Sequence, residues 1–511
     1  MTKDNSKYCT FVTIFSQVSV FLPLALNAVA LNPIDEVITE FINETYQHRW
    51  NITVNNEDAL FIITLAQSML MVGSLVGAFA ARYTLMIMSR RTNLVLVHFM
   101  SVVSCVLMSP VAFYCKSYET LIAGRLINGF ARGIGFTVVP LIVAETTSRA
   151  TLALFQAPTV AIMDLGSAAG NILGYPIVLG SGDRWPYLLG ISGIFSVAYL
   201  CLVPWLPETP TYLILQEEKS AKTTTKNYSN FPSFHLLRKL RSGDLETVRK
   251  EYEDIKDEIY ADLQITKASL KEIFTTKRYR RQFFGALVIY FSFQSTGIQA
   301  IVLYTDKIFH EAGIPYNQAT LYTAGFFIVM ALICFASTPI LKRFGSRKMT
   351  LFGLVVTAFA LAMLSASIEL KLAYGSIAAI VLYAFGVSSG PLLCYAALAS
   401  EITSQVIRPT ALWSCGICYY AMASTVSFVT PYTVDWIGGY TYLIFVGLVV
   451  LDVIYIKFAI QDTSASSMLT PRITIEEATS TEDDESTSLL SGKKPFYGAR
   501  EHDDTHFEKH I

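Results

Sequence analysis

Two ionisable residues, Arg132 and Asp164, lie inside long apolar stretches of the sequence. A charged side chain at the centre of a bilayer costs about 2.5–3.5 kcal/mol even on the most lenient insertion scale, so it is rare unless it is paired or faces water. If both side chains face a cavity, they can contact a polar, charged or zwitterionic substrate, or relay a proton. If they face each other, they neutralise one another between two helices. The sequence leaves both interpretations open, and both predict that the two residues are important for function or stability.

The sequence contains no nucleotide-binding loop, catalytic triad or metal-ligand cluster, so we predict no enzyme activity, no cofactor and no metal. The 511 residues are 52% hydrophobic and only 15% charged, whereas soluble domains average about 25% charged residues. The 39 Lys and Arg nearly balance the 40 Asp and Glu, which argues against nucleic acid as a partner. The eight cysteines lie mostly in apolar runs and do not resemble a disulfide framework. This composition indicates a protein that lies in a lipid bilayer.

Apolar runs of about 20 residues, long enough to cross a bilayer as a helix, recur along the chain. They lie near residues 10–31, 58–81, 92–114, 119–143, 152–176, 186–206, 281–305, 317–341, 348–367, 373–399, 409–433 and 438–460. We therefore predict an all-α polytopic membrane protein with about twelve transmembrane helices in two pseudo-symmetric six-helix halves. The predicted parts are a first half (1–206), a cytoplasmic helical insert (207–280), a second half (281–461) and a disordered cytoplasmic tail (462–511).

Basic residues predict the orientation of these helices. The loops 82–91 and 342–348 contain arginine or lysine and no acid, whereas the loop 32–57 is acidic. Because basic loops stay in the cytoplasm, both termini and the insert are predicted inside and the loop 32–57 outside. The N-x-S/T sequences at Asn43 and Asn51 fall in this outside loop, where we expect glycosylation.

Carboxylates and arginines recur at the cytoplasmic ends of the predicted helices. Glu145 lies in AETTS (144–148) and Glu401 in SEITS (400–404), at matching positions of the two halves. Such carboxylates can pair with arginines when the halves close on the inside, and these pairs break when the halves rock. The residues expected to form this inner gate are Glu145, Glu208, Glu401, Arg82, Arg90, Arg91, Arg149, Arg343, Arg347 and Arg408.

Several stretches resemble the major facilitator superfamily, and more closely the animal glucose-transporter type of sugar facilitator. They are NAVALNPIDEVITEFINETYQHR (27–49), GRLINGFARGIGFTVVPLIVAE (124–145), PETPT (207–211), FQSTGIQA (293–300) and KRFGSRK (342–348). The resemblance runs from about residue 10 to residue 460. It implies the fold of that superfamily, transport by alternating access and a glycan on Asn43.

The resemblance also implies where a sugar would bind. The family offers two glutamines and an asparagine on helix seven, where this chain has Phe293, Gln294 and Gln299. The asparagine–tryptophan pair of helix eleven corresponds to Tyr419 and Tyr420. Four further sugar-binding positions of the family carry no matching side chain; they are Val160, Met330, Ser388 and Ala396. At about 1 kcal/mol per hydrogen bond, these replacements should weaken glucose binding by several kcal/mol.

These observations allow three interpretations of the function. The first is a facilitative transporter of a small polar solute, hexose or sugar-like by resemblance. The second keeps the fold but changes the substrate to an organic anion or another charged metabolite, because of Arg132 and Asp164. The third is a membrane sensor that binds a solute without transporting it.

The tail contains a short sequence that resembles a sorting signal. Glu485 lies four residues before the pair Leu489 and Leu490 in an acidic, Ser/Thr-rich stretch. An acidic residue at that spacing is typical of dileucine signals read by sorting adaptors; the alternative is a chance pair of leucines. The expected location is the plasma membrane, with cycling through endosomes or lysosomes.

Overall fold

The computed structural model describes residues 7–148, 151–156, 158–220, 231–241, 245–264 and 270–460. Throughout these ranges the regular structure is helical and contains no strand. Residues Met1–Asp462 form one compact unit. The prediction of an all-α fold is therefore confirmed for the described part of the chain.

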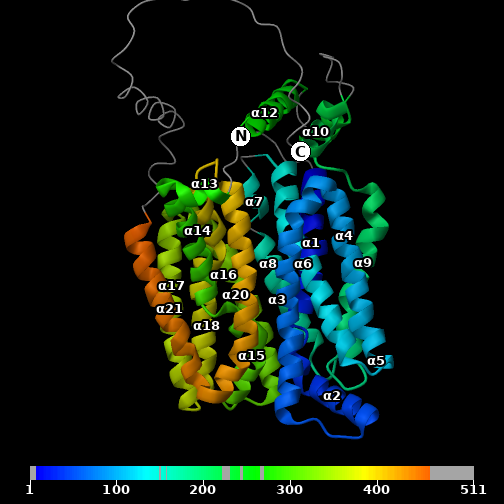
Figure 1. Cartoon of the computed structure of the whole chain (residues 1–511), viewed down its shortest axis with the longest axis vertical. Helices are drawn as coiled ribbons and strands as arrows, with labels where there is room; N and C mark the ends of the chain where they lie inside the picture. The colour runs from blue at the N-terminus through cyan, green and yellow to red at the C-terminus, as the bar shows by residue number, and fades with distance from the viewer. Residues whose placement is uncertain are drawn as a thin grey trace, which may run out of the picture. The chain divides into compact units, whose positions relative to one another are not determined.

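The first half consists of six membrane-crossing segments at the predicted places (Figure 1). The third segment continues without interruption through a π-helical turn, η2, where Pro110 lacks the N–H of a regular α-helix. The fifth segment is made of two pieces, α7 and α8. The elements are α1 (Lys7–Val29), α3 (Asn56–Ile87), α4 (Arg90–Val106), η2 (Leu107–Val111), α5 (Ala112–Tyr114), α6 (Tyr118–Thr146), α7 (Leu152–Gln156), α8 (Pro158–Leu173), α9 (Trp185–Leu202) and η3 (Val203–Trp205).

The second half repeats this plan, with breaks in its first and fourth segments. The elements are α14 (Lys277–Ser295), α15 (Ile298–Glu311), α16 (Tyr316–Phe344), α17 (Ser346–Glu369), α18 (Ala373–Ser389), α19 (Pro391–Ile402), α20 (Arg408–Ile437), η5 (Gly438–Tyr440) and α21 (Thr441–Ala459). Among the described residues, ten helical stretches are long and apolar enough to cross a membrane. One of these stretches, Arg408–Ala459, contains both α20 and α21, and the short helix α8 is not among the ten. The observed segments therefore correspond to the twelve predicted spans.

Two regions that connect membrane-crossing segments contain helices of their own. The outside region 32–57 contains η1 (Asn32–Ile34) and a helix, α2 (Asp35–Trp50), that follows α1 directly. The insert contains α10 (Pro210–Ser220), α11 (Pro232–Arg241), α12 (Leu245–Gln264) and α13 (Leu270–Thr275). Figure 1 shows α10 and α12 at the end of the bundle opposite to α2. This placement agrees with an insert and an outside loop on different sides of a membrane.

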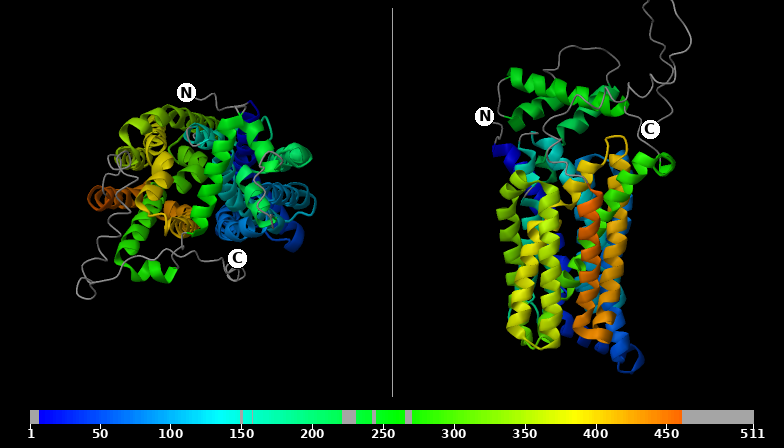
Figure 2. Two further views of the ribbon diagram at one scale, coloured as in Figure 1. Left: turned by 90° about the horizontal axis from the view of Figure 1, so that it is seen from above. Right: turned by 90° about the vertical axis from the view of Figure 1, so that its left-hand side faces the viewer.

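The two halves meet along two pairs of helices. Helix α3 packs against α20, and α8 packs against α16. These are segments two and eleven, and segments five and eight. Segment two of the first half corresponds to segment eight of the second, and segment five corresponds to segment eleven. The repeat therefore exchanges the two pairs, as expected for two halves related by an internal repeat. Figure 2 shows the two groups of helices from above.

Small residues bring helices of the first half into close contact. A Cβ on Gly77 of α3 would lie 2.2 Å from the carbonyl oxygen of Phe130, and one on Gly129 of α6 would lie 2.0 Å from that of Leu70. Backbones at this distance leave no room for any side chain. The four-residue spacing of glycines on α3 and α6 is therefore a packing feature.

Candidate functional site

The seventh membrane-crossing segment is broken between α14 and α15, and the predicted glutamines lie on either side of the break. Gly297 in the break has a φ of 72°, a conformation that side chains disfavour. The hydroxyl of Tyr383 donates to the carbonyl of Thr296 at 3.1 Å, and so provides a partner for a main-chain group at the end of α14. Gln294 and Gln299 therefore flank irregular backbone in the interior of the protein, where such breaks typically build binding sites.

Both glutamines contact Tyr419 of α20. Nε2 of Gln294 donates to the main-chain carbonyl of Tyr419 at 3.3 Å, and Nε2 of Gln299 donates to its hydroxyl at 3.5 Å. Oε1 of Gln294 is buried and accepts no hydrogen bond from any residue that the structure describes. A buried acceptor without a partner is unfavourable, so this oxygen is suited to accept a hydrogen bond from a solute.

Aromatic rings line the same place, and we call them the aromatic wall: Tyr290, Phe293, Tyr395, Tyr419 and Tyr420. The rings of Phe293 and Tyr395 are nearly parallel, with centroids 4.8 Å apart, and the Tyr419 ring is parallel to Phe293 at 5.9 Å. Tyr290 lies edge-on to Tyr395 at 5.0 Å, and Tyr420 lies edge-on to Tyr419 at 5.0 Å. The wall joins α14, α19 and α20.

Two members of the wall, Tyr290 and Tyr395, were not predicted from the sequence. Tyr290 precedes Phe293 by three residues and therefore shares its helix face, a signal that periodicity could have provided. Tyr395 is on α19, far along the chain, and no local pattern indicates that its ring meets Phe293.

Arg132 of α6 faces the aromatic wall. Its guanidinium lies close enough to Tyr419 and Tyr420 to act on them electrostatically, and it lies 5.3 Å from the centre of the Phe136 ring. Its Nε and Nη1 atoms are buried and donate to no acceptor within the described ranges. A buried guanidinium in this condition favours an acceptor supplied by a solute.

Asp164 of α8 does not meet Arg132. It is 7% exposed, and its Oδ2 has no hydrogen-bond partner among the described residues. Its charge acts on Cys334 of α16, so its side chain is near the interface between the halves, whereas Arg132 is directed at α20. No ion pair joins the two side chains in the described part of the chain. Of the two interpretations that the sequence leaves open, direct neutralisation of one side chain by the other is therefore not observed in this conformation.

Among the described residues of the first half, the predicted inner gate contains one formed ion pair. Nη2 of Arg90 lies 2.9 Å from Oε1 of Glu145 and joins α4 to α6. The hydroxyl of Thr209 also donates to Glu145, and the Tyr212 ring lies 5.4 Å from the Arg90 guanidinium. The start of the insert is thus attached to the pair that joins α4 and α6.

Glu208 binds the start of α4. It accepts from the hydroxyl of Ser89 at 2.5 Å and from the main-chain N–H of Arg91 at 3.4 Å. A carboxylate at a helix N-terminus is favoured by the helix dipole. This contact differs from the side-chain ion pair that the sequence predicted for Glu208.

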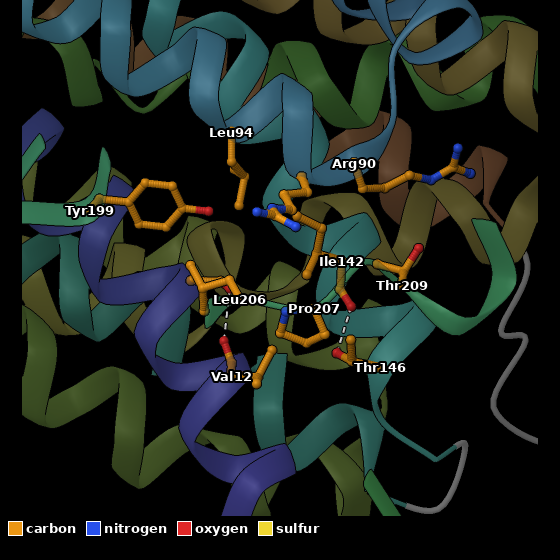
Figure 3. Close-up of a pocket in the computed structure, with 11 residues that line it drawn as sticks. Val12, Arg90, Leu94, Ile142, Thr146, Tyr199, Leu206, Pro207 and Thr209 are labelled. Atoms are coloured by element: carbon orange, nitrogen blue, oxygen red, sulfur yellow. Dashed lines mark hydrogen bonds between the residues drawn. The ribbon is translucent and has the colours of Figure 1, made fainter. Parts of the chain in front are cut away.

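A cavity of about 20 Å³ adjoins this gate and is lined by Leu94, Tyr199 and Ile142, among others. Figure 3 shows the Tyr199 hydroxyl directed toward the cavity and the end of the Arg90 side chain directed away from it. A cavity of this volume holds about one water molecule. It is therefore too small to be the solute site.

The gate residues of the second half make hydrogen bonds to a hydroxyl and to main-chain carbonyls. Ser346 donates to Glu401 at 2.7 Å, Arg347 donates to the carbonyl of Lys457 at 2.8 Å, and Arg408 donates to that of Thr403 at 3.0 Å. Arg343 lies 6.0 Å from the centre of the neighbouring Phe344 ring. Arg149 lies outside the described residues, as does the tail with Glu485, Leu489 and Leu490.

Arg82 contacts the other half through an aromatic ring. Its guanidinium lies 4.9 Å from the centre of the Trp413 ring on α20, and Phe79, one turn earlier, lies 5.5 Å from the same ring. The sequence predicted a carboxylate partner for Arg82. The observed partner differs because α20, which faces this part of α3, presents a tryptophan here.

The predicted glycosylation sites are on or next to α2. Asn43 is partly buried, and its Oδ1 accepts from the main-chain N–H of Val54 at 2.9 Å. Asn51 follows the last turn of α2 and is exposed, with a φ of 57°. Asn51 is therefore the more accessible of the two.

The chain matches the model of the family described as "Sugar (and other) transporter" over residues 30–470. It is 27% identical over 450 residues to a Pongo abelii protein named solute carrier family 2, facilitated glucose transporter member 5, and 26% identical over 450 residues to the Homo sapiens protein of that name. Each alignment covers 87% of both chains. A Mus musculus protein named member 7 is 25% identical over 448 residues, which are 87% of this chain and 85% of that protein.

Solved structures of the xylose transporter XylE from E. coli share the fold. The partially occluded inward-open form has a TM-score of 0.72 at 15% identity, over 89% of this chain and all of that chain. The proton:xylose symporter XylE bound to 6-bromo-6-deoxy-D-glucose has a TM-score of 0.70 at 16% identity, over 89% of this chain and 96% of that chain.

Proposed function

The chain belongs to the sugar (and other) transporter family, and from this membership we propose that it carries a small, polyhydroxylated, sugar-like solute past the aromatic wall. A member of this family is a multi-pass membrane transporter that works by alternating access, and not an enzyme. The relatives named facilitated glucose transporters support facilitative transport.

The observation that carries this proposal is the polar break beside the aromatic wall. Gln294 contributes a buried acceptor that has no partner among the described residues, and Gln299 donates a hydrogen bond to the hydroxyl of Tyr419. Hydroxyl groups both donate and accept, so they complement such amides. The ring of Tyr419, which stacks on Phe293 and is only partly buried, offers apolar contact to the C–H groups of a sugar ring.

Movement of the two halves would expose this site to each side in turn. The interfaces α3–α20 and α8–α16 join the halves, and Arg82 with Trp413 adds a contact between them. A solute shifts the balance between conformations only by binding one of them more tightly. We expect the remaining gate residues to act in the same way, by stabilising the closed cytoplasmic side.

Arg132 favours a second candidate, a solute that carries a carboxylate. Its Nε and Nη1 have no acceptor among the described residues, and charge-assisted hydrogen bonds to an anion are about twice as strong as neutral ones. A neutral sugar could also accept from Arg132, but it would leave the positive charge without a counter-ion. Asp164 belongs to the same proposal as a buried carboxylate that could take up a proton.

The test is transport by the purified chain in liposomes, with counterflow of radiolabelled solutes. A neutral hexose and the corresponding uronate form a matched pair that differs by one carboxylate. Preference for the hexose supports the first candidate, and preference for the uronate that is lost in Arg132→Gln supports the second. Binding of either solute without counterflow would overturn both candidates and support a non-transporting sensor.

The proposal also includes the cellular location of the protein and its binding partners other than the solute. We expect the protein at the plasma membrane, with glycans on Asn43 or Asn51, and sorting adaptors bound to Glu485, Leu489 and Leu490. Support comes from the acidic outside region and the spacing of the tail residues. Replacement of both leucines by alanine should raise the surface fraction of tagged protein; an unchanged fraction would remove the motif from the proposal.

A further inference from the structure

A second, larger cavity lies toward the outer end of the bundle, apart from the aromatic wall. Its volume is about 200 Å³, far above the roughly 10–15 Å³ that one water molecule needs, so it has room for a small organic molecule. Its walls come from both halves: η1, α2 and α3 of the first, and α15 and α20 of the second. Asp35 is the first residue of the outside helix α2, so the cavity belongs to the outer side.

Three residues in the wall of this outer cavity each have a buried oxygen with no hydrogen-bond partner in the part of the chain that the structure describes. They are Thr64 and Gln67 of α3 and Asp306 of α15, which are 1%, 2% and 1% exposed. Oγ1 of Thr64, Oε1 of Gln67 and Oδ1 of Asp306 make no hydrogen bond to any described residue. Oε1 of Gln67 cannot donate a hydrogen bond, and neither can Oδ1 of Asp306 when its carboxyl group is ionised. The missing partner is therefore a donor.

The second carboxylate oxygen of Asp306, Oδ2, makes a hydrogen bond that orients the carboxylate. This oxygen accepts from the hydroxyl of Thr320 on α16 at 3.1 Å, and the residue is part of the wall of the outer cavity. A carboxylate oriented in this manner presents one oxygen in a fixed direction. Such orientation reduces the entropy lost when a ligand binds.

The charge of the cavity wall is negative. The carboxylates Asp35, Glu36 and Asp306 line it, against one ammonium, that of Lys307, and one imidazole. The Lys307 ammonium attracts Asp35 and also Glu311, which limits how far it compensates Asp306. Carboxylates in a partly enclosed site attract a cation more strongly than they would in water.

Tyr304 connects the outer cavity to the guanidinium groups of the interior through its interactions. It lines the cavity, and its hydroxyl donates to the carbonyl of Ser427 on α20 at 2.8 Å. Arg125 lies close enough to interact electrostatically with both Tyr304 and Arg132. A cation in the outer cavity therefore meets positive charge on its way inward, which opposes its passage to the aromatic wall.

We propose that the outer cavity is a binding site for a small, hydroxylated primary ammonium compound, held by Asp306, Gln67 and Thr64. The ammonium N–H groups donate to Asp306 and Gln67, and a hydroxyl of the ligand bonds Thr64. No residue that lines the outer cavity belongs to the aromatic wall, and none of Gln294, Gln299 and Arg132 lines it, so this site is distinct from the proposed transport site and does not depend on what is transported. Because the ligand would bridge both halves, its binding should stabilise the conformation that contains the cavity.

The experiment is calorimetric titration of the full chain in lipid nanodiscs at pH 7. The probe is ethanolamine, and its neutral counterpart is ethylene glycol, in which a hydroxyl replaces the amine. We expect ethanolamine to bind at least tenfold more tightly than ethylene glycol. We expect Asp306→Asn and, independently, Gln67→Met to weaken ethanolamine at least tenfold, with unchanged elution on size exclusion as evidence of folding.

Glu40→Gln provides the control, because Glu40 is an exposed carboxylate on the same outside helix but does not line the cavity. It should leave the affinity for ethanolamine unchanged. Equal affinity for the two probes, no binding of ethanolamine, or unchanged affinity in a folded Asp306→Asn or Gln67→Met variant would each overturn the proposal. If Asp306→Asn does not fold, Gln67→Met decides the outcome.

Discussion

The guanidinium of Arg82 lies 4.9 Å from the centre of the Trp413 ring, and this contact joins α3 of the first half to α20 of the second at their cytoplasmic ends. Phe61 and Phe428 meet at 6.2 Å farther along the same two helices, toward the outer side. The α3–α20 interface therefore has an aromatic contact at each end. Only the cytoplasmic one includes a charge, and it can be weakened without changing the apolar packing.

Replacement of Arg82 by Gln should favour conformations in which the cytoplasmic ends of α3 and α20 separate. A cation–π contact at an exposed site contributes about 0.5–1 kcal/mol, which corresponds to a shift of roughly two- to fivefold in the population. The measurement is the distance between spin labels on the cytoplasmic ends of the two helices. The matched control is Arg278→Gln, because Arg278 is an exposed arginine in the first turn of α14 and is not one of the predicted gate residues. Equal distance distributions for wild type and Arg82→Gln would contradict this role.

Gly77→Ala should destabilise the protein by about 1–3 kcal/mol, the usual effect of forcing extra atoms into a packed interior. The added Cβ would lie 2.2 Å from the carbonyl oxygen of Phe130, so α3 and α6 have to move apart. Thermal unfolding in detergent measures the effect as a lower Tm. Gly325→Ala on α16 is the control, since nothing lies within 4 Å of a Cβ at that position. Similar Tm values for the two variants would show that the α3–α6 contact tolerates a side chain.

The membrane-crossing segments could be predicted from the sequence because each corresponds to a local pattern, a run of about 20 apolar residues. The gate residues could be predicted only in part. Arg90 and Glu145 do pair, but the partner of Arg82 is Trp413, on a helix more than 300 residues later in the sequence. The direction of a long side chain depends on neighbours that local patterns do not reveal.

The central site shows the same limit. Gln294, Gln299 and Tyr419 come together as the resemblance implied. Arg132 and Asp164 have similar predicted depth, but depth does not specify which face of a helix a residue occupies. The rotation of α6 directs Arg132 to α20, and that of α8 leaves Asp164 near α16. Helix rotation is a property of tertiary packing, and so the separation of Arg132 from Asp164 emerges only from the structure.

A double-mutant cycle on Arg90 and Glu145 should give a coupling energy of about 0.5–3 kcal/mol, because the pair is largely buried. Glu145→Gln alone should destabilise the protein more than the double variant with Arg90→Gln, since the single variant leaves a charge without its partner. Denaturant unfolding provides the four free energies. The exposed pair Arg249 and Glu253 on α12 is the control, with an expected coupling of at most about 0.5 kcal/mol. Additive effects of the two gate substitutions would refute the coupling.

Treatment with a glycosidase should lower the apparent mass of the protein from animal cells. The double variant Asn43→Gln/Asn51→Gln should run at the mass of the treated wild type, because both residues lie in the region predicted outside. Gel mobility measures the shift. Asn227→Gln is the control, as its N-x-S sequence lies in the insert predicted to be cytoplasmic. A wild-type protein that does not shift, or a shift removed by Asn227→Gln, would reverse the predicted topology.

Tyr419→Phe should raise the KM for the transported solute about three- to tenfold and leave kcat unchanged. The substitution keeps the ring that lies parallel to Phe293 and removes the hydroxyl to which Gln299 donates. One neutral hydrogen bond contributes about 0.5–1.5 kcal/mol, and loss of an interaction made equally in the bound and transition states appears in KM alone. Tyr419→Ala should raise KM further, because aromatic contacts add about 0.5–1.5 kcal/mol each. The exposed Tyr374 is the control, and Tyr374→Phe should transport as wild type does. If Tyr419→Phe and Tyr374→Phe have the same KM in liposomes, the solute does not bind at the aromatic wall.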